Sequence, residues 1–108
     1  MNRSLTSLQA FYDMQEFLEV YFKKTSSDEL GALLSCMQFL EDGQTADPVL
    51  WEDWKSILKT TQNITQLQAF EAMAVFLNNY YKNTTSSHVK QILKDIDDII
   101  AHGFGANF

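Results

Sequence analysis

The sequence has few basic residues: eight Lys and Arg stand against fourteen Asp and Glu, which leaves a formal charge of -6. That sign does not suit a protein that must hold nucleic acid phosphates. The single cysteine, Cys36, excludes an internal disulfide. A helix needs about 20 apolar residues to span a bilayer, and no apolar run in the sequence approaches that length. The first residues contain no basic stretch followed by an apolar run, so no secretory signal and a cytoplasmic location are expected.

Side chains that perform chemistry are equally sparse. The only histidines are His88 and His102, both expected at helix ends, and Cys36 is expected in the core. Asp95, Asp97 and Asp98 lack the glycine and spacing of a calcium loop and are expected to be solvated. There is neither a glycine-rich phosphate loop nor a His-Cys zinc pattern. The sequence therefore predicts a protein that is not an enzyme, with no cofactor and no metal.

The chain does contain an internal repeat. Its 108 residues are 45% hydrophobic, enough for one domain with a core. Residues 5–37 align with residues 64–96 at a constant offset of 59 and share 13 identities in 33 positions. The identical positions of the first copy are Thr6, Leu8, Gln9, Ala10, Phe11, Met14, Phe17, Leu18, Tyr21, Lys23, Thr25, Ser27 and Leu34.

Each copy has the pattern of a helical hairpin. Thr6 and Gln9 have the spacing of a capping box, which predicts a helix start, and the second copy repeats this pattern. Apolar residues then recur at intervals of three and four, the spacing of one helix face. Polar Ser and Thr residues near position 25 predict a short connection, and Ser26 with Glu29 predicts a second capping box. Each copy therefore holds two helices.

A further helix is expected between the copies. Gly43 is expected to end the preceding helix, and Asp47 followed by Pro48 predicts an N-cap with proline at the first helical position. The predicted fold is all-α: a compact bundle of about five helices, with hairpins at about 5–41 and about 64–101 joined by a central helix at about 47–60. The tail, residues 103–108, is either a frayed end or a docked segment.

The net negative charge comes from the first half of the chain. Residues 1–54 hold ten acids and three bases, a charge of -7, whereas residues 55–108 hold four acids and five bases, a charge of +1. Acids at helix starts also stabilise the helix dipole, so a solvated acidic face remains an alternative. On the functional interpretation they steer a basic partner toward an aromatic anchor, for which Trp51, Trp54 and Phe39 are candidates unless they are core residues. The predicted partner-binding residues are Asp28, Glu29, Glu41, Asp42, Asp47, Trp51, Glu52 and Asp53.

These motifs together resemble a known family. The block Leu8-Gln9-Ala10-Phe11 with Met14, Phe17-Leu18, Tyr21 and Thr25-Ser26-Ser27-Asp28-Glu29-Leu30, the central Asp47-Pro48 and Trp51-Glu52-Asp53-Trp54, and the second start Leu67-Gln68-Ala69-Phe70 resemble immunity proteins of bacterial contact-dependent growth inhibition systems. The second copy departs from this pattern, because Ser87 and His88 replace the acidic pair Asp28-Glu29. The resemblance implies a partner: the basic C-terminal toxin domain, often a nuclease, of a large surface effector, which the immunity protein binds and neutralises.

The implied partner agrees with the charge. A ribonuclease must be basic to hold RNA, so a compact acidic protein can compete for that surface. Affinity should be nanomolar or better, on the order of -12 kcal/mol, over an interface of roughly 1,600 Å². A helical adaptor or homodimer is the alternative, because Ala72, Ala74 and Val75 give one helix an apolar circumference that indicates either a central position or a dimer seam.

Overall fold

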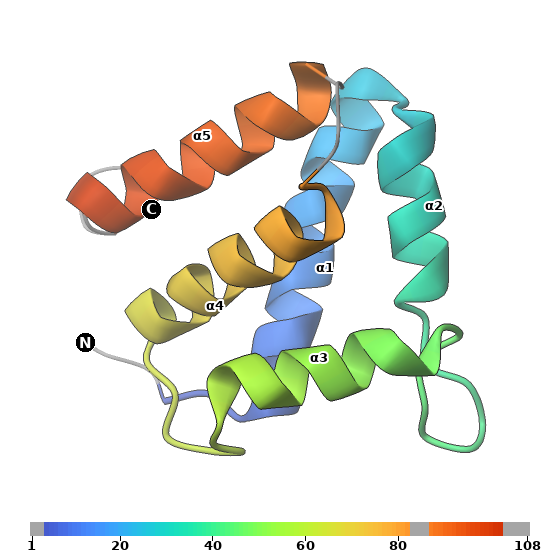
Figure 1. Cartoon of the computed structure of the whole chain (residues 1–108), viewed down its shortest axis with the longest axis vertical. Coiled ribbons are helices and arrows are strands. Elements are labelled where there is room, and N and C mark those ends of the chain that lie inside the picture. The colour runs from blue at the N-terminus through green and yellow to red at the C-terminus, as the bar shows by residue number, and fades with distance from the viewer. Residues whose placement is uncertain (1–3, 83–86, 103–108) are drawn as a thin grey trace.

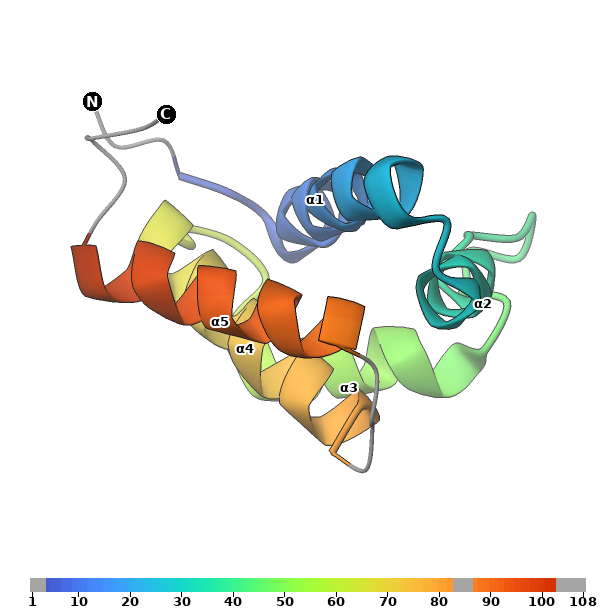
Figure 2. The same ribbon diagram turned by 90° about the horizontal axis from the view of Figure 1, so that it is seen from above.

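A computed structural model describes residues 4–82 and 87–102 of the chain. These residues form α1 (Ser7–Thr25), α2 (Asp28–Cys36), α3 (Pro48–Leu58), α4 (Gln66–Tyr80) and α5 (Ser87–His102). They include no β-strand beyond two isolated bridges. Seen from above, α1 and α2 lie on one side, α4 and α5 on the other, and α3 beneath them (Figure 2). The all-α prediction, with two hairpins around a central helix, is confirmed.

Side chains at the helix starts explain where the helices begin. The Thr6 hydroxyl accepts the Gln9 amide at 3.0 Å, and the Gln9 side chain accepts the Thr6 amide at 2.9 Å. Thr65 and Gln68 form the same reciprocal pair at the start of α4. Asp47 caps α3 through the Val49 amide, directly before Pro48. Each cap pairs N–H groups that a helix start leaves without partners, so these three helix starts are confirmed as the sequence predicts them.

Two predicted helix boundaries are wrong. Ser26 does not cap α2; it ends α1 in the left-handed conformation, at φ 53°, and the Ser27 hydroxyl accepts the Leu30 amide at the start of α2 instead. Gly43 does not end α2, which stops at Cys36. With φ 82° it lies in the turn of the following loop, where its amide donates to Leu40 at 3.0 Å.

The two copies of the repeat are related by a local twofold axis. Leu5 and Ile64 are equivalent residues, and they pair with each other in an antiparallel bridge with N–O distances of 2.8 and 2.9 Å. Such reciprocal pairing of equivalent residues arises when an axis passes between them. The helices that follow, α1 and α4, therefore cross as an equivalent pair (Figure 1).

Ring contacts in the core obey the same axis. Phe11 of α1 meets Phe76 of α4 edge to face, at 6.4 Å between centroids. Phe17 of α1 meets Phe70 of α4 at 5.8 Å. Phe17 is the counterpart of Phe76, and Phe70 is the counterpart of Phe11, so the two contacts are one contact repeated. The repeat in the sequence is thus a symmetry of the core.

Two tyrosine hydroxyls tie each hairpin to the other. Tyr21 of α1 donates to the carboxylate of Asp95 on α5, and Tyr81, just after α4, donates to the Glu29 carbonyl on α2 at 2.9 Å. Burial, followed by the bond to Asp95, raises the pKa of Tyr21; burial also leads the causes that raise the pKa of Tyr81. Asp95 is half-buried and accepts the Tyr21 hydroxyl, which corrects the prediction of a solvated residue.

The central helix α3 breaks the symmetry and completes the core on one side. Trp54 is fully buried, donates its indole N–H to the Ser7 carbonyl at 2.9 Å and meets Phe11 and Phe76 at 5.8 Å each. The helix α4 packs against α1, α3 and α5. This central position accounts for the buried Ala72 and the half-buried Ala74, whereas Val75 is 47% exposed. The predicted tail, residues 103–108, lies outside the described residues.

Candidate binding surface

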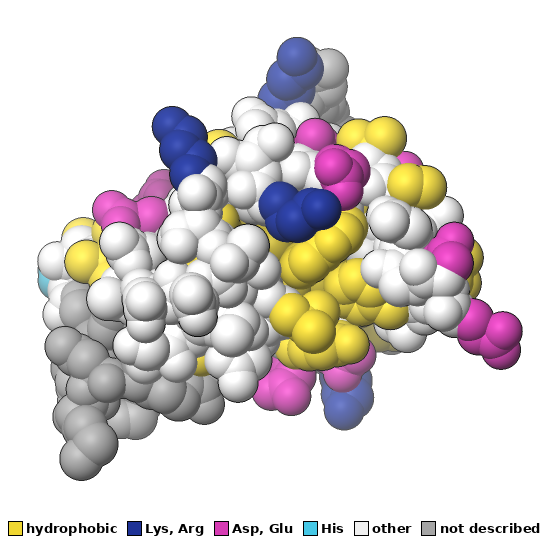
Figure 3. All heavy atoms as spheres, turned by 90° about the horizontal axis from the view of Figure 1, so that it is seen from below, with side chains coloured by type: hydrophobic (Ala, Val, Ile, Leu, Met, Phe, Trp, Pro, Cys, Tyr) yellow, Lys and Arg dark blue, Asp and Glu magenta, His cyan; other side chains and the backbone are white. Residues whose placement is uncertain are grey.

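The underside of the molecule exposes a group of hydrophobic side chains, here called the aromatic patch: Leu8, Tyr12, Phe39 and Trp51. Tyr12 is 45% exposed, and Leu8, one turn earlier on α1, is 40% exposed. Phe39 lies 5.7 Å from Tyr12 and 5.3 Å from Trp51, with the rings edge to face. Figure 3 shows hydrophobic side chains gathered on this face, with acidic side chains near its edges.

The aromatic patch rests on the core. Phe11, which is fully buried, lies 5.6 Å beneath Phe39 and 5.4 Å beneath Trp51. These contacts hold both half-buried rings in one orientation. Binding of a partner over these rings costs little side-chain entropy, because the rings are already ordered.

The loop between α2 and α3 is held in place by hydrogen bonds. Backbone bonds join Ala46 to Gln38 at 2.7 Å and Leu40 to Gln44 at 2.8 Å, around the bridge between Phe39 and Thr45. The Gln15 side chain ties the loop to α1 by donating to the Met37 carbonyl at 2.9 Å. Phe39 therefore projects from an ordered loop.

A cation already lies on the aromatic patch. The Lys55 ammonium lies 5.6 Å from the ring centroid of Trp51 and 2.8 Å from the Glu52 carboxylate. An ammonium over an aromatic face is stabilised by the ring quadrupole, most strongly when the ring is an indole. The ring and the carboxylate together therefore form a binding site for a positive charge.

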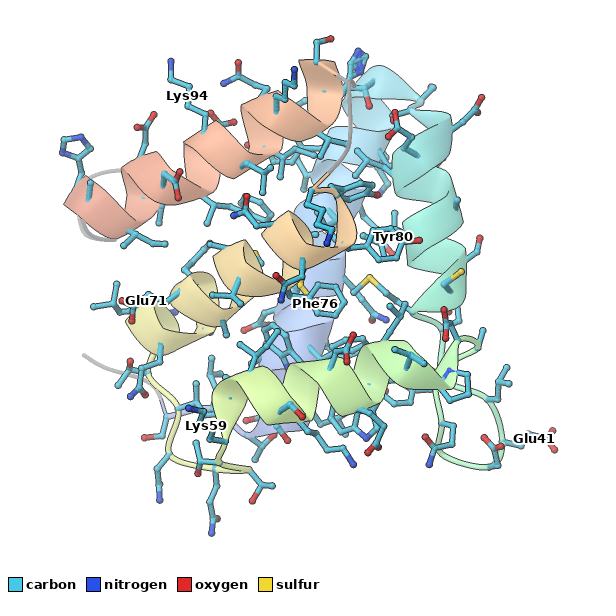
Figure 4. All side chains as sticks on the ribbon, viewed as in Figure 1. Glu41, Lys59, Glu71, Phe76, Tyr80 and Lys94 are labelled. Atoms are coloured by element: carbon cyan, nitrogen blue, oxygen red, sulfur yellow. The ribbon has the colours of Figure 1, made fainter. Side chains whose placement is uncertain are left out.

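The structure divides the eight predicted partner-binding residues into three groups. Trp51 belongs to the aromatic patch, and Glu52 lies beside it through Lys55. Glu41 and Asp42 lie in the loop that also carries Phe39, and Glu41 points outward at the loop tip (Figure 4). Asp47 and Asp53 lie on the other flank of α3, where they line a hollow of about 260 Å³ with the exposed Val49 and Tyr80. Asp28 and Glu29 lie at the far end of α2, about 11–12 Å along that helix from Cys36 (Figure 1).

Two of these acids also have local roles. The Asp42 carboxylate accepts the Gln44 amide at 2.9 Å in the turn, and Asp47 caps α3. Both the local and the partner-binding interpretations of the acids therefore have support. Glu41, Glu52 and Asp53 are exposed and make no such backbone contact among the described residues, so they are the cleaner probes of binding.

Sequence reasoning missed Tyr12, misplaced Leu8 and left open which tryptophan belongs to the core. Leu8 is one of the apolar residues that recur at helical spacing in both copies, which predicts a place on the core-facing side of its helix, but it is 40% exposed. Trp54, a candidate anchor, is fully buried and belongs to the core, whereas Trp51 and Phe39 are half-buried. The repeat held the signal for Tyr12: its counterpart is Glu71, and a position that tolerates both residues is expected to face solvent.

The remaining residues that could perform chemistry do not form a site among the described residues. His88 and His102 are exposed at the two ends of α5, and Cys36 is half-buried at the end of α2. No group of three or more His, Cys, Asp or Glu that could hold a metal ion occurs among the residues that the structure describes. Within the same residues, no helix has the length and apolar character to cross a membrane.

Comparison with protein-family models, curated proteins and solved structures finds no match.

Proposed function

We propose that this chain is a stoichiometric inhibitor that binds a basic protein domain, as an immunity protein binds its toxin. It is not an enzyme; it acts by covering its partner, and the partner implied by the family resemblance is the nuclease domain of a surface-delivered effector. The observation that supports this proposal is the site in which Trp51 and Glu52 bind the Lys55 ammonium. A lysine or arginine of a partner would meet the same two groups there.

The aromatic patch supports tight binding and the charge supports fast binding. Ordered aromatic rings on the surface are the side chains that most often dominate binding energy at protein interfaces. Glu52 lies beside Trp51, where it pairs with Lys55, and Glu41 extends into solvent from the loop that carries Phe39, whereas Lys59 and Lys94 lie elsewhere on the molecule (Figure 4). A cationic partner is therefore steered toward the patch, and the rings then slow its dissociation.

Co-purification with the protein encoded immediately upstream tests this function. The two proteins are expected to form a complex, and one equivalent of this chain should abolish the partner's nuclease activity. Leu8→Asp with Tyr12→Asp should prevent both, since each side chain is exposed in the patch and neither belongs to the buried core. Asp97→Lys on α5 is the surface control. Unchanged nuclease activity at equimolar ratio would contradict the proposal.

A further inference from the structure

A hollow of about 260 Å³ lies between α3 and α4, on the opposite flank of α3 from the aromatic patch. Its lining is largely apolar and includes Val49 and Tyr80, which are 58% and 43% exposed. Phe76, also in the lining, and Tyr80 lie one turn apart on α4, on the side toward α3 and α2 (Figure 4). Pockets that hold drug-sized molecules are larger, about 300–1,000 Å³, so this hollow suits a single side chain.

The charged residues that line the hollow are both acids. Asp53 is exposed, and Asp47 is half-buried at the start of α3. Only one oxygen of Asp47, Oδ1, accepts the Val49 amide of the helix cap, at 3.2 Å. None of the residues that line the hollow is basic. A positively charged side chain therefore complements both the size and the charge of the hollow.

The internal repeat explains why the Tyr80 ring remains at the surface. Its counterpart Tyr21 donates its hydroxyl to the Asp95 carboxylate and is half-buried. The counterpart of Asp95 is Cys36, whose thiol is a weak acceptor. Burial first, and then Cys36 and Asp47, raise the pKa of Tyr80, which indicates that both groups lie near its hydroxyl. Tyr80 thus presents an aromatic ring close to a carboxylate.

The aromatic patch shows what such a pair of groups binds. There the Trp51 ring and the Glu52 carboxylate bind the ammonium of Lys55, a residue of the same helix. In the hollow, Tyr80 supplies the ring and Asp53 supplies a carboxylate. Because no basic residue lines the hollow, a cation that binds there comes from another molecule.

We propose that this hollow binds an arginine side chain of the basic partner, with the guanidinium between Asp47 and Asp53 and against the Tyr80 ring. Arginine suits the hollow better than lysine, because its planar group donates to two carboxylates at once and stacks on aromatic faces. Its aliphatic stem would contact Val49. The hollow and the aromatic patch flank one helix, whose diameter is about 10–12 Å, so a single partner can reach both. The source of the arginine rests on the proposed function, whereas the site itself does not.

N-acetyl-arginine amide tests the site without the partner. In a titration of the full chain carrying ¹³C-labelled tyrosine rings, with sodium chloride of equal ionic strength as the reference, it should shift the Tyr80 resonance. The dissociation constant should be on the order of 10 mM, and N-acetyl-lysine amide, of equal charge, should bind at least about threefold more weakly. Asp53→Asn should weaken the arginine probe about threefold, whereas Asp98→Asn on α5 should leave it within about twofold.

Two results of this titration would overturn the assignment. A shift confined to Tyr12 would place the probe on the aromatic patch, and absence of any shift at about 100 mM would mean that the hollow binds no guanidinium. Equal affinity for the arginine and lysine probes would overturn the choice of arginine. Tyr80→Phe identifies the Tyr80 resonance, because it removes that signal and retains an aromatic ring.

The partner tests where the arginine comes from. Asp53→Asn should raise the dissociation constant of the complex about tenfold, and Asp98→Asn should change it less than about twofold. If the complex forms and Asp53→Asn leaves its affinity unchanged, the partner does not use the hollow; this inference then fails while the proposed function stands. If no complex forms, the proposed function fails together with this source of the arginine, and the titration of the free chain still decides whether the hollow binds a guanidinium.

Discussion

The indole nitrogen of Trp54 donates to the carbonyl of Ser7 at 2.9 Å, joining the central helix to the start of the first. Trp54→Phe should lower the free energy of unfolding by about 1–3 kcal/mol, because it leaves a small cavity and removes a donor from a buried carbonyl. Trp51→Phe, on a half-buried ring, should cost less than about 1 kcal/mol. Urea unfolding measures both, and equal losses would contradict this division between core and surface.

The start of α2 tests the corrected cap. Ser27→Ala should destabilise the protein by about 1 kcal/mol, because the Ser27 hydroxyl accepts the Leu30 amide. Ser26→Gly should stabilise it by about 0.5–1 kcal/mol, because Ser26 has φ 53°, a conformation that suits glycine. Thermal unfolding distinguishes them. Destabilisation by Ser26→Gly with no effect of Ser27→Ala would restore the boundary predicted from sequence.

Alkaline pH should weaken the fold through Tyr21. Its pKa in the folded state is raised, first by burial and then by the bond to Asp95, whereas in the unfolded chain it is about 10. Below pH 10 both states keep the proton and the contribution is complete. Above pH 10 the unfolded state loses its proton first, so the free energy of unfolding falls as pH rises. In denaturant titrations between pH 9 and 11, the free energy of unfolding of Tyr21→Phe should fall less steeply than that of the parent chain. Parallel pH curves for the two proteins would count against this.

Removing the cation from the aromatic patch should favour the partner. Lys55→Gln takes away a charge that repels a basic protein and vacates the place over Trp51. Partner association should accelerate about twofold to fivefold, with little change in stability, because the Lys55–Glu52 pair is largely exposed. Lys94→Gln on α5 is the control of equal charge. Slower association with Lys55→Gln would mean that Lys55 contacts the partner favourably.

Much of the fold follows from local sequence. Thr6 and Gln9 with their repeat copies, and Asp47 before Pro48, mark three helix starts because capping depends only on nearby residues. The repeat also indicated which helices are equivalent. The α1–α2 boundary was misjudged because adjacent serines offer the same hydroxyl, and only the left-handed backbone of Ser26 decides between them.

The candidate site was less predictable because it depends on tertiary packing. Trp51 and Trp54 lie one turn apart on α3, yet only Trp54 enters the groove between α1 and α4. Glu52 and Asp53 are adjacent in sequence but lie on different flanks of α3, because successive helical residues are rotated by about 100°. Charge counts find the acidic half of the chain, but they do not show which acids border the rings.

The rate of association with the basic partner tests the central claim most directly. Stopped-flow measurements at 50 and 200 mM salt should compare the parent chain with Glu41→Lys plus Glu52→Lys and with the control Asp97→Lys plus Asp98→Lys. The first pair should slow association about tenfold and flatten its salt dependence, while the control stays within about twofold. Equal slowing by both pairs, or by neither, would contradict binding at the acidic aromatic patch.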